Sequence, residues 1–231
     1  MSEKHLRKGS KFPQKENGQL RLYSTKYCPY AQRVRIVLAL KDIPYETVNL
    51  HCFDKPEWMY DLNPAGLVPI FDTGTELLTE SLKICNYLEK AFPKPSLPLN
   101  ERDATLLAEF DALLALFYKV ANNPDLGDFL QLLKHVEKYE GELSKRGKYF
   151  GGDEPRMIDF MIWPWAERAA MFDKLFPEHL PAPDALHNLR AWCARMRQHP
   201  TLLQLRTNVE SQIEIYDLVR AGKHKEIDFD I

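Results

Sequence analysis

Polar and apolar residues alternate along two short stretches early in the chain, residues 19–24 and residues 45–50. An alternation with a period of two is typical of a β-strand that buries one face. Between these stretches, residues 31–41 are good helix formers and follow Pro29, and proline is favoured in the first turn of a helix. A strand, a helix and a second strand at this spacing predict two parallel strands joined by a right-handed crossover.

The next part of the chain predicts the remainder of an α/β domain. A short helix is expected at residues 58–62. Two apolar runs, 67–71 and 76–79, flank a turn sequence and predict a hairpin, and residues 81–92 predict a closing helix. The segment 93–100 then holds three prolines, which is typical of a linker between domains.

After residue 100 the apolar residues recur at intervals of three and four, which predicts helices only. One of these helices is expected at about residues 156–172, and Pro164 should kink it. The predicted fold class is therefore α/β plus all-α. Its parts are an N-terminal extension, an α/β domain and an all-helical domain, at residues 1–18, 19–97 and 101–231.

The composition narrows the classes of function. The chain has 231 residues, of which 31 are basic and 33 acidic, so no overall field attracts nucleic acid or an anionic membrane. The polar N-terminus lacks the apolar core of a signal peptide, and no stretch approaches the ~18 apolar residues of a membrane span. We expect a cytosolic protein with a small-molecule or protein partner.

The four cysteines lie far apart, without the spacing of metal ligands or of a disulfide framework, so we expect reduced thiols and no metal. Cys28 differs from the others because it precedes Pro29 at the start of the predicted helix. Free backbone N–H groups and the helix dipole favour negative charge there, and hence a nucleophilic thiolate. The alternative is an unreactive, buried thiol, which is the better interpretation of Cys52, Cys85 and Cys193.

Residues 28–31, Cys-Pro-Tyr-Ala, have the outline of the Cys-x-x-Cys redox motif with Ala31 in place of the second cysteine. A mixed disulfide formed at Cys28 therefore has no resolving thiol within the motif. The resolving thiol must come from outside, and glutathione is the abundant cytosolic candidate. The sequence thus predicts glutathione as a co-substrate.

Two further places could hold a peptide-like ligand. Val68-Pro69 precedes a strand that begins at Ile70, in front of the thiol helix, which predicts a cis Val68–Pro69 bond and a Val68 backbone turned outward to pair with a ligand. Glu80 and Ser81 open the closing helix, and a helix N-terminus with a hydroxyl can bind a carboxylate. An ordinary N-cap would use the same residues, so both interpretations of this pair remain open.

Five segments of the chain together form a specific pattern: Tyr27–Arg33, Lys55–Trp58, Asn63–Pro69, Glu80-Ser81 and Ile158–Trp165. On these segments the chain resembles the omega class of cytosolic glutathione transferases, over nearly its whole length. The resemblance implies a thioredoxin-like N-terminal domain, an all-helical C-terminal domain and a homodimer. It also implies glutathione-dependent thiol transfer and reduction of dehydroascorbate or methylated arsenic. Conjugation should be weak, since a cysteine captures glutathione as a disulfide.

The same resemblance implies roles for single residues. Cys28 would form the mixed disulfide with glutathione, and Pro29 and Pro69 would support the site. Glutathione itself would be held at three points: the glycine carboxylate by Lys55, the cysteinyl backbone by Val68, and the γ-glutamyl end by Glu80 with Ser81. Without the resemblance, the better interpretation of Lys55 would be a solvated surface lysine.

One position departs from the family pattern. The pattern has Ser or Thr three residues before Asp159, where it caps a helix, but this chain has Arg156, whose guanidinium cannot accept a hydrogen bond. A local folding signal is weakened there without any effect on the site. Residues 212–220 are expected to cover the pocket of the second substrate, whose identity the sequence does not reveal. Large aromatic residues at helical spacing usually pack in a core, and here they are Trp163, Trp165 and Trp192.

Two other functions share parts of this pattern. Chloride intracellular channel-like relatives have the same fold and lone cysteine motif, but they use an apolar first helix, whereas this one carries Arg33, Arg35 and Lys41. A non-catalytic glutathione-transferase-like binding protein would not need a thiolate at Cys28. We therefore predict an enzyme and keep both alternatives below it.

Overall fold

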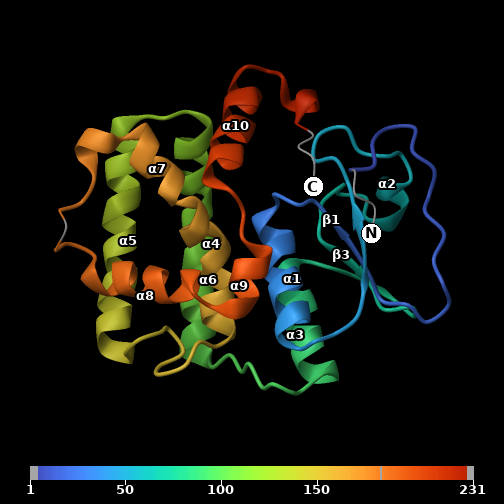
Figure 1. Ribbon diagram of the computed structural model, residues 1–231, viewed down its shortest axis with the longest axis horizontal. Helices are drawn as coiled ribbons and strands as arrows, with labels where there is room; N and C mark the ends of the chain where they lie inside the picture. Colours follow the sequence, from blue (N-terminus) through green and yellow to red (C-terminus); the bar gives the residue numbers. More distant parts are fainter. Residues whose placement is uncertain (1–4, 183, 228–231) are drawn as a thin grey trace. The chain divides into compact units, whose positions relative to one another are not determined.

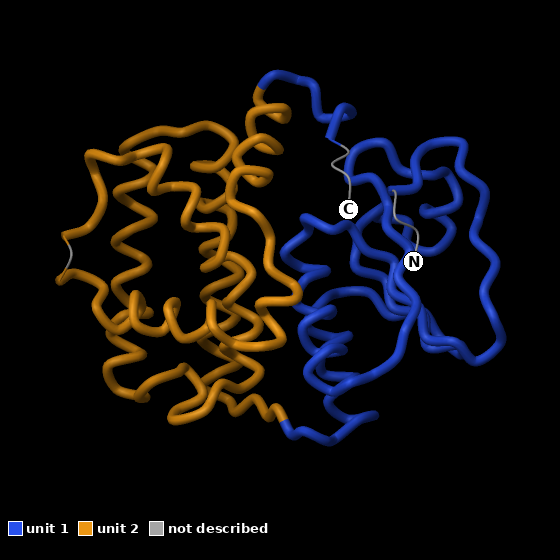
Figure 2. The backbone as a smooth tube through the Cα atoms, in the orientation of Figure 1, with its two compact units in different colours: residues 1–96, 221–231 blue, residues 97–220 orange. Residues whose placement is uncertain are grey.

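The computed structural model describes residues 5–182 and 184–227, and Figure 1 shows how the helices and strands follow one another. The chain forms two compact units (Figure 2). Unit 1 runs to Ser96 and also contains the segment that begins at Ala221, whereas unit 2 comprises Leu97–Arg220. Unit 1 combines a sheet with helices, and the described residues of unit 2 form helices and no strand. The predicted fold class is confirmed.

Unit 1 is built on a four-stranded sheet in the order β2-β1-β3-β4. Its strands are β1 (Arg21–Ser24), β2 (Glu46–Asn49), β3 (Ile70–Asp72) and β4 (Leu77–Thr79). β1 and β2 are parallel, with Ser24 opposite Asn49, and β3 pairs antiparallel with both β1 and β4. The predicted parallel pair and the predicted hairpin are therefore both confirmed.

Helices cover both faces of this sheet. α1 (Pro29–Leu40) and α3 (Ser81–Ala91) pack against each other on one face, and α2 (Met59–Leu62) lies on the other (Figure 1). Successive strand residues point to opposite faces, so a strand between two helical layers buries both sets of side chains. In β1, Tyr23 packs with Met59 of α2, and its fully buried neighbour Leu22 points the other way.

The described part of unit 2 contains seven α-helices around an aromatic core. They are α4 (Glu101–Asn122), α5 (Leu126–Arg146), α6 (Met157–Arg168), α7 (Ala170–Leu175), α8 (His187–Arg197), α9 (Pro200–Leu205) and α10 (Val209–Arg220). Trp163, Trp165 and Trp192 are each at most 1% exposed, which confirms that they belong to the core. None of the helices described here has the length and apolar character needed to cross a membrane.

The helix expected at about residues 156–172 is in fact two helices. α6 continues through Pro164 and ends at Arg168, and α7 begins at Ala170. A proline has no N–H and its ring disturbs the helical turn around it. Here α6 continues for one turn beyond Pro164 before it ends. The Arg168 guanidinium donates to the carbonyl of Pro164 at 2.5 Å, so the residue that ends α6 is tied back to the proline.

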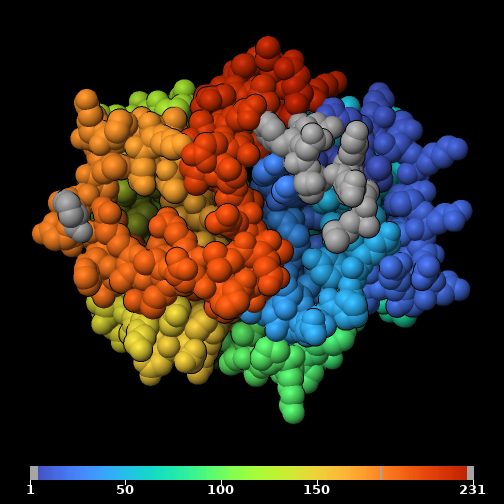
Figure 3. All heavy atoms as spheres, viewed as in Figure 1, coloured from blue at the N-terminus to red at the C-terminus, as the bar shows by residue number. Residues whose placement is uncertain are grey.

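Unit 2 also contains an apolar cavity of about 390 Å³. Its walls include Phe117, Phe129, Trp165 and Trp192 from four helices. Figure 3 shows a hollow between the atoms of α7 and those of α8. None of the residues expected to bind glutathione lines this cavity.

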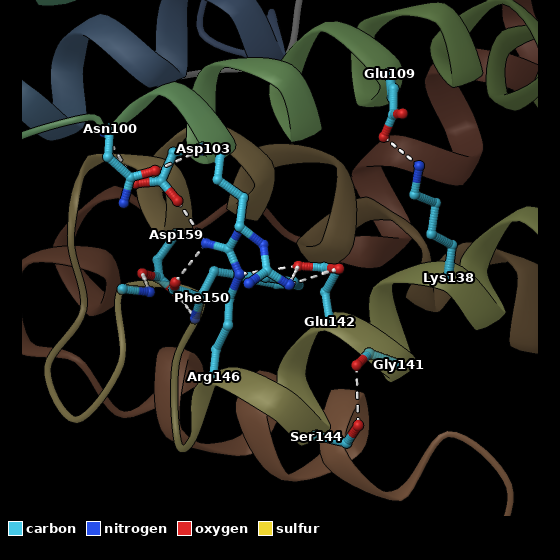
Figure 4. Close-up of polar contacts among 12 residues, drawn as sticks. Asn100, Asp103, Glu109, Lys138, Gly141, Glu142, Ser144, Arg146, Phe150 and Asp159 are labelled. Carbon is cyan, nitrogen blue, oxygen red and sulfur yellow. Dashed lines mark hydrogen bonds and ion pairs between the residues drawn. The ribbon is translucent and has the colours of Figure 1, made fainter.

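The start of α6 is held by the carboxylate of Asp159, which is completely buried. This carboxylate accepts a hydrogen bond from the backbone N–H of Arg156 at 2.9 Å. It also accepts from the N–H groups of Phe150 and Gly151, at 2.8 and 2.9 Å (Figure 4). In the other direction, the Asp159 N–H donates to the backbone carbonyl of Arg156 at 3.0 Å. Because Arg156 supplies no side-chain acceptor, the capping box is half formed, as the sequence predicts.

An ion pair anchors the loop in front of α6. Arg146 of α5 pairs with the buried carboxylate of Asp103 in α4 (Figure 4). The same guanidinium donates to the carbonyl of Phe150 at 3.0 Å. The loop is thereby fixed to two helices before it reaches Asp159.

Replacing Arg156 with serine should stabilise the protein, because a serine hydroxyl can accept the N–H of Asp159 and complete the box. We expect a gain of about 1 kcal/mol in the free energy of unfolding, the usual worth of a serine cap. Urea melts measure it. Arg156→Ala is the matched control, since it removes the arginine without adding an acceptor. Equal stabilities of the serine and alanine variants would contradict the capping explanation.

Candidate functional site

Cys28 occupies the N-cap position of α1, at the end of the loop that leaves β1. Its Sγ accepts a hydrogen bond from the backbone N–H of Ala31 at 3.5 Å, and its own N–H donates to the carbonyl of Thr25 at 3.0 Å. Arg35, further along α1, donates to the carbonyl of Thr25 at 3.1 Å and so holds the same loop. The half-buried sulfur thus lies where the helix N-terminus favours negative charge.

Val68 reaches this thiol from the start of β3. The Val68–Pro69 bond is cis, as predicted, and the carbonyl oxygen of Val68 lies 4.0 Å from the Cys28 Sγ. Val68 precedes the first residue of the strand, Ile70, so it lies outside the paired part of the sheet. Its backbone is therefore next to the sulfur on which a ligand thiol would bind.

The start of α3 differs from an ordinary serine cap. Glu80, not Ser81, occupies the N-cap position, and its φ of 69° is unusual for a residue with a side chain. Such strained conformations cost about 1–3 kcal/mol and occur preferentially at functional sites. Ser81 is 5% exposed, and its hydroxyl accepts a hydrogen bond from the Arg33 guanidinium at 3.4 Å. A buried cation from α1 thus lies beside the Glu80-Ser81 pair.

Lys55 joins the group through Cys52. Burial raises the pKa of the Cys52 thiol to about 11, the negative charge of Cys28 adds to this, and Lys55 opposes it. Lys55 lies in the loop that follows β2, the strand that pairs in parallel with β1, and the chain continues from β1 to Cys28. Among the described residues, no cluster of His, Cys, Asp or Glu could hold a metal ion.

Sequence reasoning did not assign Arg33 or Arg35 to the site. Both lie on α1, where the sequence indicates charges that a membrane-inserting helix would avoid, and Arg33 also ends the Tyr27–Arg33 segment of the family resemblance. In the structure Arg33 is only 1% exposed, and a buried cation requires a partner. The partner of Arg33 depends on how α1 packs against α3, and this packing cannot be read from the sequence.

The cysteines other than Cys28 should be unreactive at neutral pH. Burial raises the pKa of Cys85 to about 12 and that of Cys193 to about 11, and Cys52 is similarly raised. A brief treatment with iodoacetamide at pH 7 should therefore modify Cys28 first, because only a thiolate reacts quickly. Peptide mass spectrometry checks it, and rapid labelling of any other cysteine would contradict it.

The chain matches two families of domains. Residues 22–96 match the glutathione S-transferase N-terminal domain, and residues 120–195 match the glutathione S-transferase C-terminal domain. A pyrimidodiazepine synthase from Drosophila melanogaster is 39% identical over 223 residues, which is 91% of this chain and 90% of that protein. The omega-1 glutathione S-transferase of Mus musculus is 32% identical over 229 residues, 94% of this chain and 93% of its own.

A solved structure agrees with these matches. Glutathione transferase Omega 3C from Trametes versicolor superposes with a TM-score of 0.73 at 24% identity, covering 93% of this chain and 94% of its own. The chain belongs to the glutathione transferase family. Within that family it is related to the omega class, as its own segments indicate.

Proposed function

We propose that this glutathione transferase is a glutathione-dependent thiol transferase and dehydroascorbate reductase that works through a Cys28–glutathione mixed disulfide. The observation that carries the proposal is the sulfur of Cys28 at the N-terminus of α1, with the Ala31 N–H directed at it. That environment favours a thiolate that attacks sulfur. A serine or tyrosine hydroxyl there would only polarise glutathione for conjugation.

The reaction needs two exchanges. The Cys28 thiolate attacks the glutathione sulfur of a mixed disulfide, forms a Cys28–glutathione bond and releases the other thiol. A second glutathione thiolate then attacks the bound glutathione sulfur, so glutathione disulfide leaves and the Cys28 thiolate returns. In dehydroascorbate reduction the Cys28 thiolate adds to a carbonyl carbon of dehydroascorbate, and a glutathione thiolate then attacks the Cys28 sulfur, which forms the Cys28–glutathione disulfide and releases ascorbate. A second glutathione resolves this disulfide as above, so two glutathione molecules supply the two electrons and leave as glutathione disulfide.

The remaining residues would hold glutathione in place. Lys55 would bind the glycine carboxylate, and Val68 would pair with the cysteinyl backbone next to the Cys28 sulfur. Glu80 and Ser81 would hold the γ-glutamyl end, with the carboxylate near the free N–H groups of α3. The nearness of Arg33 to Ser81 supports an anionic group at this point.

Lys55→Ala and Ser81→Ala should each raise the KM for glutathione, by roughly 5- to 150-fold, if each removes a charge-assisted contact worth about 1–3 kcal/mol. Steady-state kinetics with varied glutathione measure it. Lys83→Ala is the control, because Lys83 is exposed on α3 and has no role in the proposed site. An unchanged KM in both site variants would remove these residues from the binding site.

The proposal itself is tested by turnover. Purified protein should reduce hydroxyethyl disulfide and dehydroascorbate with glutathione as the reductant, and should conjugate chlorodinitrobenzene only weakly. The proposal would be refuted if the protein reduced neither hydroxyethyl disulfide nor dehydroascorbate. The homodimer and the cytosolic location stay predictions.

A second candidate function follows from the relative in Drosophila melanogaster. That protein is called a pyrimidodiazepine synthase and shares 39% of its aligned residues with this chain. We therefore propose pyrimidodiazepine formation in the presence of glutathione as an alternative reaction of the same Cys28 site. Chromatographic detection of the product in wild type, and its loss in a Cys28 variant, would support it.

A further inference from the structure

Cys52 comes close to Cys28 because of the way the sheet is built. β1 and β2 are parallel neighbours in register, so the loops that leave their carboxyl ends begin side by side. The N–H of Leu50 donates to the carbonyl of Ser24 at 2.7 Å, and the hydroxyl of Thr25 donates to the carbonyl of Leu50 at 2.7 Å. One loop continues from this junction to Cys28 and the other to Cys52, a few residues further on in each case.

Hydrogen bonds fix both loops at the two cysteines. The N–H of Cys28 donates back to the carbonyl of Thr25 at 3.0 Å. In the second loop, the Nδ1 of the buried His51 accepts the N–H groups of Phe53 and Asp54, at 3.2 and 2.8 Å. The backbone therefore turns around Cys52, which is held in a defined position.

The electrostatics distinguish Cys52 from the two other cysteines outside the motif. The charged neighbours that act on Cys85 and Cys193 are arginines. Cys52 is the thiol on which the negative charge of Cys28 acts, and Lys55 acts on it with the opposite sign. The pairing of β1 with β2 therefore brings the loops that carry Cys28 and Cys52 to the same edge of the sheet, although 24 positions separate the two cysteines in the sequence.

We propose that Cys52 is an internal resolving thiol for the Cys28–glutathione mixed disulfide. This inference rests on the proposed function, which supplies that mixed disulfide. The Cys52 thiolate attacks the sulfur of Cys28, the bond between Cys28 and glutathione breaks, and a Cys28–Cys52 disulfide forms. Glutathione leaves as a thiolate and takes up the proton that Cys52 has lost. The disulfide substrate has already supplied the oxidation, and two glutathione molecules reduce the internal disulfide afterwards.

Formation of the mixed disulfide removes one of the two causes that raise the pKa of Cys52. Burial is the main reason that the pKa of Cys52 is raised, and the charge of a Cys28 thiolate raises it further. Once the Cys28 sulfur is part of a disulfide, that charge is gone and the positive charge of Lys55 remains. The thiolate of Cys52 therefore becomes easier to form at the step at which attack on Cys28 is productive.

The concentration of glutathione decides which thiol resolves the disulfide. At pH 7 a thiol with a pKa of about 11 is ionised to ~10⁻⁴, against ~3% for an ordinary thiol such as that of glutathione. The greater nucleophilicity of the more basic thiolate recovers about tenfold, which leaves Cys52 roughly 30-fold behind. Neighbouring groups in one molecule reach effective concentrations far above those of free reactants. Cys52 should thus prevail when reduced glutathione is scarce.

Mass spectrometry of the full-length protein, treated with oxidised glutathione after removal of reductant, tests the role of Cys52. The Cys52→Ser variant should accumulate one glutathione adduct, on Cys28. Wild type should show at least roughly fivefold less adduct than Cys52→Ser. It should also show a protein species that is two hydrogens lighter, whose digest contains the Cys28 and Cys52 peptides joined by a disulfide. Cys193→Ser is the matched control and should behave as wild type, and thermal melts verify that each variant is folded.

The possible failures can be told apart. If wild type and Cys52→Ser accumulate the same lasting adduct on Cys28 and no linked peptide is found, the role of Cys52 is overturned and the proposed function stands. If Cys52→Ser forms no adduct on Cys28 at all, the proposed function falls, and the role of Cys52 falls with it.

Discussion

Cys28→Ser should lose thiol transfer and dehydroascorbate reduction, by roughly a thousandfold or more, the scale of loss that follows removal of a covalent nucleophile. The reason is the chemistry of the intermediate, because a hydroxyl at the N-terminus of α1 cannot form a disulfide with glutathione. The measurement is the rate of glutathione oxidation with hydroxyethyl disulfide, and separately with dehydroascorbate. Retained reductase activity would refute the assignment of Cys28.

The same variant offers a second readout. The serine leaves the proposed glutathione contacts unchanged and places a hydroxyl next to the bound thiol, so conjugation of chlorodinitrobenzene should persist or rise. Loss of both activities would indicate damage to the site instead of a change of chemistry. Cys193→Ser is the control for cysteine replacement. Because Cys193 lies in unit 2, this variant should have both activities unchanged.

Patterns within one segment of the chain predicted most elements of the fold correctly, although the helix expected at about residues 156–172 is two helices. The alternation in β1 and β2 gave the parallel pair, and Cys28 beside Pro29 gave the thiol at the start of α1. Each of these conclusions depends on neighbouring residues, so the sequence contains the necessary information. The parts that were missed depend on through-space contacts or on local backbone geometry.

Glu80 and Cys52 illustrate what the sequence could not provide. A serine at the start of a helix predicts an N-cap, but the structure places Glu80 at the cap with a positive φ, which no propensity favours for glutamate. The sequence predicts an unreactive thiol at Cys52, and burial of this thiol supports that interpretation in the resting state. Its nearness to Cys28 follows from the register of β1 and β2, which pairs two loops that are distant in the chain.

Asp159→Asn should be the most destabilising conservative change in unit 2, because the two carboxylate oxygens serve four donors. One oxygen accepts the N–H of Phe150 and the indole N–H of Trp192, both at 2.8 Å. The other accepts the N–H groups of Gly151 and Arg156, both at 2.9 Å. An asparagine has one carbonyl oxygen, and its NH₂ group cannot accept a hydrogen bond.

Either orientation of the new amide therefore leaves two N–H groups facing another donor, and these groups are buried at Phe150 and Trp192 and partly buried at Gly151 and Arg156. In one orientation the N–H groups of Gly151 and Arg156 at the start of α6 lose their acceptor. In the other, the N–H of Phe150 and the indole N–H of Trp192 lose theirs. An unsatisfied buried donor costs about 1–3 kcal/mol, so we expect a loss of about 3–5 kcal/mol in the free energy of unfolding. Urea and thermal melts measure it, and Asp153→Asn is the matched control, because Asp153 is exposed in the same loop. If Asp159→Asn lowered the free energy of unfolding by less than about 1 kcal/mol, the carboxylate would not be what joins α6 and α8 to the loop between α5 and α6.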